Sequence, residues 1–389
     1  MDVQGGTEPG FEAVREAFVD NFERHREVGA ACCVYRHGRK VVDLWAGVAD
    51  SHSGRIWDAD TLQLVFSATK GATAICALRL AERGELDLDA PVVEYWPEFG
   101  AAGKQQVPVR WLLSHRSGLP VVDARLTPAD VYEWQPVVEA LAAQRPLWEP
   151  GTAHGYHALT YGFLVGEVVR RVSGRSPGRF FAEEIAAPLG LDMWIGLPAE
   201  LEPRVSRLIR PTPFAPPAGF DVSTLPQVVK DMVDAFLDPN SLTQRALTVT
   251  EPPIEWNDPA THRAEIPAAN GICTARSLAR MYSAVIGAVD GVRLLSPATI
   301  EAATTEQSEG ADRVLLVSSR FGLGFMLHSA FSAMLGPTSF GHSGAGGSLG
   351  FADPESGVSF AYVMNQMQQN LGGDPRPLSL VNAVRKSLT

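Results

Sequence analysis

Ser67 and Lys70 form the one Ser-x-x-Lys sequence that the five lysines of this 389-residue chain produce. On a helix, a spacing of three places both side chains on one face and within reach of each other. A hydroxyl beside an amine is suited to nucleophilic catalysis, in which the amine takes the proton of the attacking serine. Taken alone, however, Ser67 is explained equally well as the N-cap of a helix.

The elements around this pair follow from hydrophobic periodicity. Residues 62–66 form a short apolar run, and apolar residues then recur in a helical pattern from residue 72 to Gly84. Ser67 is therefore expected at a strand-to-helix junction. The unpartnered N–H groups and the positive dipole end of a helix N-terminus favour an oxyanion there.

A second serine lies in Gly346-Gly347-Ser348-Leu349-Gly350, which fits the Gly-x-Ser-x-Gly turn of α/β-hydrolases. That fold requires a histidine after the nucleophile in the chain, and all nine histidines precede Ser348. The sequence thus argues against an α/β-hydrolase. We expect these glycines to let the backbone approach an active-site strand closely.

Further motifs follow Ser67 along the chain. They are Leu112-Leu113-Ser114-His115-Arg116-Ser117-Gly118-Leu119, Trp148-Glu149-Pro150-Gly151-Thr152-Ala153-His154-Gly155-Tyr156-His157-Ala158, Pro188-Leu189-Gly190-Leu191 and Gly341-His342-Ser343-Gly344-Ala345-Gly346. With them the chain resembles the serine β-lactamase-like superfamily, specifically the class C-related carboxylesterases called family VIII esterases. The resemblance runs in order from about residue 10 to residue 388, and the combination is far more specific than any single motif.

The resemblance implies a chemical role for four residues. Ser67 looks like the nucleophile that becomes acylated, and Lys70 looks like its partner in the first motif. Tyr156 looks like the tyrosine of the second motif, which exchanges protons with the nucleophile and the leaving group. By the same resemblance, the backbone N–H groups of Ser67 and Ala345 would form the oxyanion hole.

Substrate-binding residues are implied in the same way. His342, Ser343 and Gly344 occupy the place of the Lys-Thr-Gly strand of β-lactamases. His157 is expected to line the pocket beside Tyr156. His154 and His157 are three residues apart, but no carboxylate or third ligand accompanies them, so we expect no metal site and no cofactor.

Two positions depart from the β-lactamase pattern. Ala158 stands where β-lactamases usually have Asn, so an amide that helps to bind acylamino side chains is missing. His342 replaces a lysine, and an unperturbed imidazole, with a pKa near ~6.5, is mostly neutral at pH 7. Both changes favour neutral esters over carboxylated lactams. His342 also has a second interpretation, as a satisfied histidine beside the strand.

The identity of the base stays open at this stage. Free lysine and tyrosine side chains titrate near ~10.4 and ~10, so neither is a ready base at pH 7. Either burial and a hydrogen bond to Ser67 lower the pKa of Lys70 towards neutrality, or Lys70 stays cationic and holds Tyr156 as a phenolate. We expect the two groups to act as a coupled pair.

The order of predicted elements indicates an α/β (α+β) protein. We expect a mainly antiparallel sheet flanked by helices, formed from residues 1–110 and 260–389, and a mostly helical domain over residues 111–259. This is the architecture that the β-lactamase and penicillin-binding-protein transpeptidase resemblance implies, with the site between the two parts. Residues 203–267 are rich in proline and are interpreted either as a cover over the site or as a surface wrap.

The boundaries of individual elements are predicted from periodicity and turn residues. Helices are expected at both ends of the chain and in its middle, over residues 10–27, 161–172, 179–187 and 378–388. Strands are expected near both ends, at 30–36, 40–48, 62–66, 322–327, 339–343, 348–352 and 358–364.

Composition limits the classes of partner. The chain has 44 acidic and 33 basic residues, a net charge of −11 and no Lys/Arg-rich run, which argues against nucleic acid. No stretch approaches 18 apolar residues and the N-terminus lacks an apolar leader region, so we expect a cytoplasmic protein without membrane contact. Cys32, Cys33, Cys76 and Cys273 lack ligand spacing and are expected as buried reduced thiols.

The sequence thus predicts a serine hydrolase that cleaves short-chain carboxylic esters through an acyl-enzyme on Ser67. The expected partner is a small-molecule ester. Three alternatives stay open: a β-lactamase or D,D-peptidase-like activity, an acyltransferase, and a catalytically silent binding module. The sequence does not decide between a monomer and a homodimer.

Overall fold

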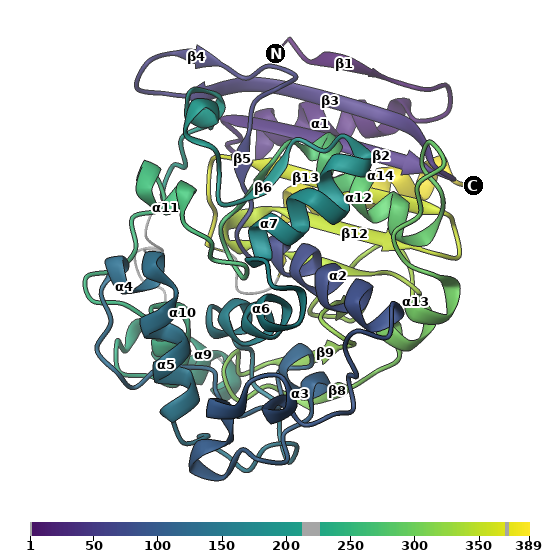
Figure 1. The fold of residues 1–389 in the computed structure, drawn as a ribbon. Helices are drawn as coiled ribbons and strands as arrows, with labels where there is room; N and C mark the ends of the chain where they lie inside the picture. The colour runs from purple at the N-terminus through teal and green to yellow at the C-terminus, as the bar shows by residue number, and fades with distance from the viewer. Residues whose placement is uncertain (1, 212–225, 370–372) are drawn as a thin grey trace.

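The main sheet joins the two ends of the chain (Figure 1). The computed structural model describes residues 2–211, 226–369 and 373–389. In these residues ten strands form one sheet in the order β1-β3-β2-β13-β12-β11-β10-β9-β8, with β4 beside β3. Every neighbouring pair is antiparallel. The strands are β1 (Gln4–Thr7), β2 (Gly29–Arg36), β3 (Arg39–Asp50), β4 (Arg55–Ile56), β8 (Ser308–Ala311), β9 (Ser318–Phe321), β10 (Met326–Leu327), β11 (Phe340–Ser343), β12 (Leu349–Asp353) and β13 (Val358–Met364).

Helices cover both faces of this sheet. Helices α1 (Glu12–Arg24) and α14 (Pro375–Ser387) pack together on one face, and α12 (Ala275–Ile286) packs on β2, β12 and β13 from the other. Successive side chains of a strand point to opposite faces of the sheet. Cys32 and Cys33 follow this rule, because they are neighbours in β2 yet belong to the cores on opposite faces. Both thiols are buried and unpaired, as expected from the sequence.

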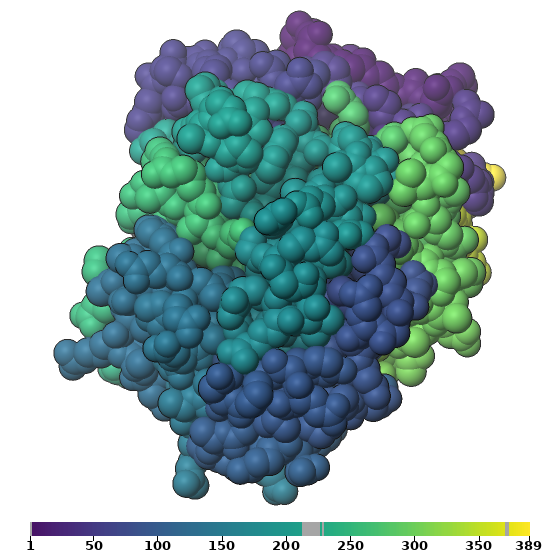
Figure 2. Space-filling model, viewed as in Figure 1, coloured from purple at the N-terminus to yellow at the C-terminus, as the bar shows by residue number. Residues whose placement is uncertain are grey.

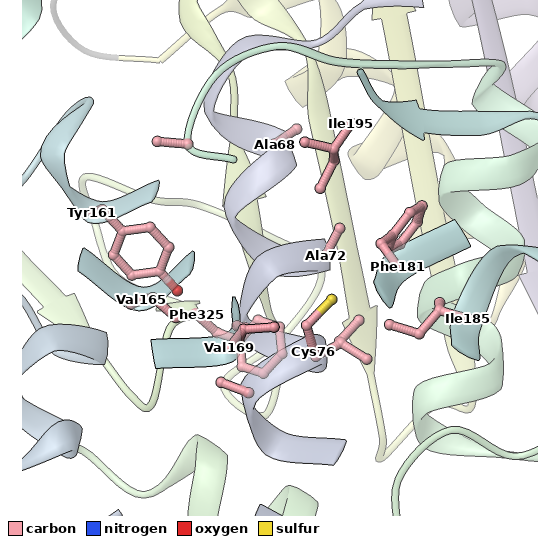
Figure 3. Packing of buried hydrophobic residues seen from close by; sticks show 14 of the residues in the cluster. Ala68, Ala72, Cys76, Tyr161, Val165, Val169, Phe181, Ile185, Ile195 and Phe325 are labelled. Atoms are coloured by element: carbon pink, nitrogen blue, oxygen red, sulfur yellow. The ribbon is translucent and has the colours of Figure 1, made fainter. Parts of the chain in front are cut away.

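Helix α2 (Thr69–Glu82) lies at the centre of the larger core. Figure 3 shows Ala72 and Cys76 of this helix, and its N-cap residue Ala68, between aromatic and aliphatic side chains of other elements. One group comes from α6 (Thr160–Ser173) and the other from α7 (Pro177–Phe181) and the residues after it. Small side chains let these helices approach closely, which fixes the position of α2 and of the residues at its start.

A second, three-stranded sheet lies beside the start of α2. It consists of β5 (Gln63–Leu64), β7 (Gly271–Cys273) and β6 (Met193–Ile195), with β7 in the middle. Strand β6 falls within residues 111–259, the stretch that the sequence assigns to the helical domain. The domain boundaries themselves stay a prediction.

The remaining helices come mostly from the middle of the chain. They are α3 (Val109–Leu113), α4 (Pro128–Glu133), α5 (Gln135–Ala143), α8 (Ala187–Leu189), α9 (Gln227–Leu237), α10 (Leu242–Leu247), α11 (Pro259–Arg263) and, nearer the C-terminus, α13 (Pro297–Thr304). In Figure 1, α3, α5, α9 and α10 lie in the lower part of the view, where Figure 2 shows a blue surface, whereas α11 and α13 lie higher, at its left and right. The predicted fold class, a mixed α/β protein with a large antiparallel sheet, is confirmed.

Several predicted boundaries need correction. The strand predicted over 322–327 is limited to β10, because Gly322 N–H donates to the Phe325 carbonyl and closes a turn. The helix predicted over 179–187 is divided into α7, a π-helical turn at Ala182–Ala186 and α8. The proline-rich stretch 203–267 contains α9, α10 and α11, while its residues 212–225 lie outside the described part of the chain.

Candidate active site

Ser67 lies in a 3-10 turn, Phe66–Ala68, between β5 and α2. Phe66 before it has φ of +47°, a conformation that non-glycine residues rarely adopt and that costs energy. Two interactions hold it: its ring packs edge-on against Trp256 at 5.2 Å, and Thr69 Oγ1 donates to its carbonyl. The predicted strand over 62–66 therefore ends early, and the chain turns so that Ser67 stays half-exposed.

Lys70, in the first turn of α2, is completely buried. Its Nζ atom lies 3.0 Å from Ser67 Oγ, and it donates to the carbonyls of Ala158 and Ala268 at 2.7 and 3.0 Å. Burial lowers the pKa of Lys70 well below its usual range, because a charged amine loses its hydration there. No carboxylate of the described residues forms an ion pair with it. Burial therefore favours the neutral form of this amine, which lies beside the Ser67 hydroxyl.

Tyr156 is the third side chain of the candidate site and lies beside Lys70. Its ring centre lies 4.8 Å from Lys70 Nζ. Burial raises the pKa of Tyr156, and the nearby Ser67 side chain only partly offsets that effect. The phenol thus stays protonated, which disfavours the phenolate alternative. The ring stacks on Phe321, with 6.0 Å between centres.

His342 lies in β11 with its ring 5.8 Å from the Tyr156 ring, centre to centre. Its Nδ1 is hydrogen-bonded with the Ser343 carbonyl at 2.7 Å, while Nε2 is buried without a hydrogen-bond partner. Burial, together with the nearby Lys70, lowers the pKa of His342 to about 3. The imidazole is consequently neutral at pH 7, and this position carries no positive charge.

Gly344 brings the end of β11 against the Ser67 turn. A Cβ atom at this position would lie 2.1 Å from the carbonyl oxygen of Val65, so only glycine fits. Ser343 beside it is exposed. Ala345 follows in a turn that Gly346, with φ of +84°, makes possible. The structure therefore brings the third motif, the predicted oxyanion residue and Ser67 to one place.

His157, which the sequence predicts to line the pocket, has both ring nitrogens bonded to protein groups. Its side chain is completely buried, Nε2 bonds to Ser117 Oγ at 2.8 Å and to Leu119 N–H at 3.1 Å, and Nδ1 bonds to the Gly155 carbonyl at 2.6 Å. Burial lowers the pKa of His157 to about 3. We interpret it as a support for the Tyr156 loop. His154 bonds to Ser319 instead, so the two histidines do not converge on a metal.

Two buried charged residues of the site were not found from the sequence. Asp312, between β8 and β9, accepts a hydrogen bond from Tyr156 N–H at 3.0 Å. Arg376, in the first turn of α14, donates to the Gly346 carbonyl at 2.7 Å. Each acts on a backbone group far away in the sequence, so no local motif signals it.

The fold and the serine–lysine–tyrosine group define a class of protein. The family model described as Beta-lactamase matches residues 14–383, and the chain belongs to the beta-lactamase family. The resemblance found in the sequence is thereby confirmed. Among the described residues, no group of three or more His, Cys, Asp or Glu is arranged to hold a metal ion, and no helix is long and apolar enough to span a bilayer.

Individual proteins of known name or structure are similar to this chain over nearly its whole length. It is 39% identical over 370 residues to "Esterase/beta-lactamase LipL" of Mycobacterium tuberculosis, covering 94% of this chain and 83% of that protein. A crystal structure of a family VIII carboxylesterase has a TM-score of 0.87 and 38% identity, with both chains fully covered. A penicillin-binding protein homologue from Caulobacter crescentus has a TM-score of 0.86 and 40% identity, again over both full chains.

Proposed function

We propose that this protein is a serine carboxylesterase that hydrolyses short-chain esters through an acyl-enzyme on Ser67. Relatives that carry esterase in their names, at 38–39% identity, support ester hydrolysis. The observation that carries the mechanism is the 3.0 Å contact between Lys70 Nζ and Ser67 Oγ.

The partners of Lys70 favour it as the base. The carbonyls of Ala158 and Ala268 can only accept hydrogen bonds, so they take two N–H groups of the amine. A neutral amine has two N–H groups and one lone pair, and the lone pair then points to the Ser67 hydroxyl. Burial without a nearby anion favours the neutral amine, whose lone pair can accept the serine proton.

The reaction follows from these positions. Ser67 Oγ attacks the ester carbonyl and its proton passes to Lys70, while the N–H groups of Ser67 and Ala345 stabilise the oxyanion. One such donor contributes about 2.7–4 kcal/mol to transition-state stabilisation. The intermediate then expels the alcohol, which takes the hydroxyl proton of Tyr156, and Lys70 returns a proton to Tyr156. In the second half of the reaction, water attacks the acyl group and gives a proton to Tyr156. The proton of Tyr156 passes to Lys70 and then to Ser67 Oγ, which leaves as the acid is released.

His342 influences whether the site prefers neutral or negatively charged substrates. Lysine at this position in β-lactamases would attract a substrate carboxylate, whereas the buried imidazole is neutral. Neutral esters therefore suit the site better than carboxylated lactams. β-Lactam hydrolysis is the second candidate, because the relative LipL carries both esterase and beta-lactamase in its name.

The deciding experiment is the intact mass of the protein after incubation with p-nitrophenyl acetate or butyrate. We expect an acyl adduct on Ser67 and complete loss of turnover in Ser67→Ala. Turnover that survives in Ser67→Ala would contradict the proposal. Nitrocefin turnover faster than ester turnover would favour the β-lactamase alternative, and acyl transfer to added alcohols in preference to water would favour an acyltransferase.

We also propose a cytoplasmic location. All four cysteines are buried and unpaired, and reduced thiols suit that compartment. Fractionation of producing cells tests this, and recovery of the protein outside the cytoplasmic fraction would contradict it.

A further inference from the structure

Arg376 is a charged side chain with no exposed surface. Each nitrogen of its guanidinium group has partners. Nε donates to Asp374 at 3.1 Å, Nη1 to Glu27 at 3.1 Å and to the Gln366 carbonyl at 2.8 Å, and Nη2 to Asp374 and to the Gly346 carbonyl at 2.7 Å each. These bonds account for all five N–H groups of an arginine, so the group is held in one orientation.

The two carboxylates that hold Arg376 come from different elements. Asp374 is the N-cap of α14, and Glu27 precedes β2. The hydroxyl of Tyr362, in β13, donates to Glu27 as well. The guanidinium is thereby fixed to both the central strands of the sheet and the last helix, and only its Nη2 atom reaches the turn after β11.

This turn, residues 344–347, contains Ala345. Gly344 N–H donates to the Ser348 carbonyl at 2.7 Å, and Gly346 accepts from both Arg376 and the Gln368 N–H. A Cβ atom on Gly347 would lie 2.4 Å from Asp374 Oδ2 and 2.7 Å from Arg376 Nη2, so the turn packs against this ion pair. This side of the turn is therefore fixed by buried charges.

We propose that Arg376 is a positioning residue for ester hydrolysis, which sets the place of the Ala345 N–H through its hydrogen bond to the Gly346 carbonyl. The inference rests on the proposed function, in which this N–H stabilises the oxyanion. Burying an ion costs free energy that a well-packed apolar side chain would avoid, so stability alone does not account for the charge. Orientation of a turn that must hold one N–H in a fixed place does account for it, because an oxyanion donor acts only at the right distance.

The test compares Arg376→Met and Arg376→Lys with the wild type. Methionine removes all five donors, whereas lysine keeps the charge between Glu27 and Asp374 but cannot reproduce the planar set of five bonds. We expect kcat/KM for p-nitrophenyl acetate to fall about 10- to 100-fold in Arg376→Met, the range for a misplaced catalytic group. In Arg376→Lys we expect a fall of at least fivefold, and this variant keeps the test valid if Arg376→Met does not fold.

A second measurement separates positioning from loss of stability. Phenylboronic acid forms a tetrahedral adduct with an active-site serine, and its affinity depends on the oxyanion donors. We expect this affinity to fall by the same factor as kcat/KM. Arg385→Met is the matched control, since Arg385 lies on the same helix and also donates to loop carbonyls, those of Met334 and Leu335. Its kcat/KM should stay within twofold of the wild type.

The two proposals fail in different ways. If Ser67→Ala is inactive but a folded Arg376→Lys or Arg376→Met variant keeps wild-type kcat/KM and boronate affinity, the positioning role is wrong and the esterase mechanism stands. A loss of activity in Arg385→Met equal to that in Arg376→Met would also overturn the positioning role. If Ser67→Ala keeps its turnover, the proposed function is wrong and the inference falls with it.

Discussion

The carboxylate of Asp312 accepts the backbone N–H of Tyr156 at 3.0 Å, although 156 positions separate the two residues in the sequence. The same carboxylate accepts the N–H groups of Val314 and Leu315 and the hydroxyl of Ser319. Four hydrogen bonds on one buried carboxylate make it a rigid support. The phenol that faces Ser67 is therefore held in place by the loop between β8 and β9.

Replacing Asp312 by alanine should reduce both stability and activity. The N–H groups left without an acceptor cost about 1–3 kcal/mol, and the Tyr156 loop loses its support, so we expect kcat/KM to fall about tenfold. Asp353 is the control, because it is also buried and accepts bonds from Thr338, Ser339 and Ser356 away from the site. Asp353→Ala should lose comparable stability in urea unfolding and keep wild-type kcat/KM. Equal kinetic losses in both variants would show that the effect is not specific to Tyr156.

Removing one phenolic oxygen tests the role of Tyr156. Tyr156→Phe should lower kcat by about 10²–10⁴, the usual contribution of a general acid or base. Tyr161 provides the control, because its ring also lies near Lys70, at 5.8 Å, and its buried hydroxyl has no hydrogen-bond partner. Tyr161→Phe should therefore keep its activity and lose no stability. A kcat for Tyr156→Phe within threefold of the wild type would contradict the role.

The pH dependence of kcat/KM should follow Lys70. Burial lowers the pKa of Lys70, and the base is the unprotonated amine, so activity should rise with pH through that lowered pKa. Burial holds the pKa of His342 and of His157 at about 3, so both rings stay neutral from pH 5 to 9 and contribute no step. Rate profiles of the wild type and of His342→Asn should rise at the same pH, which lies below the usual titration range of lysine. A profile that becomes flat in His342→Asn would assign the titration to the histidine.

Adding one carbon at Gly344 should separate the third motif from the Ser67 turn. The new Cβ would lie 2.1 Å from the Val65 carbonyl oxygen, so β11 or the turn must move. A displacement of about 1 Å is expected to cost roughly 10²-fold in kcat/KM of Gly344→Ala. Gly6→Ala is the control, since no atom lies within 4 Å of the corresponding position. Wild-type kcat/KM in Gly344→Ala would show that this contact does not position the site.

The sequence pointed to the side chains that meet at the candidate site, but not to their supports. Ser67 and Lys70 stand in a recognisable local motif, and Tyr156 was indicated by the family resemblance. The structure places the three side chains together, and their chemical roles stay a proposal. Asp312 and Arg376 act on backbone atoms 156 and 30 positions away, and such contacts exist only once the sheet is assembled. Local sequence carries no pattern for them.

In the fold, too, features set by local sequence were predicted and features set by tertiary contacts were not. Strand β13 was predicted over residues 358–364, the bounds that it has, because its apolar run is continuous and ends at turn residues. The strand predicted over residues 62–66 is limited to Gln63–Leu64 in the structure. The chain turns at Phe66, whose positive φ is held by packing on Trp256 and by the hydrogen bond from Thr69. Tertiary contacts of this kind override local propensity.

The pairing of β2 with β13 has a consequence for the newly made chain. Residues 32 and 362 are direct partners in the sheet, although one is made early and the other late. Ser67 and Lys70 therefore leave the ribosome well before β11 and β13 do. Such an unfinished chain has a hydroxyl and an amine but no strand to complete their surroundings. Hydrolytic competence therefore begins only when translation has delivered the final strands.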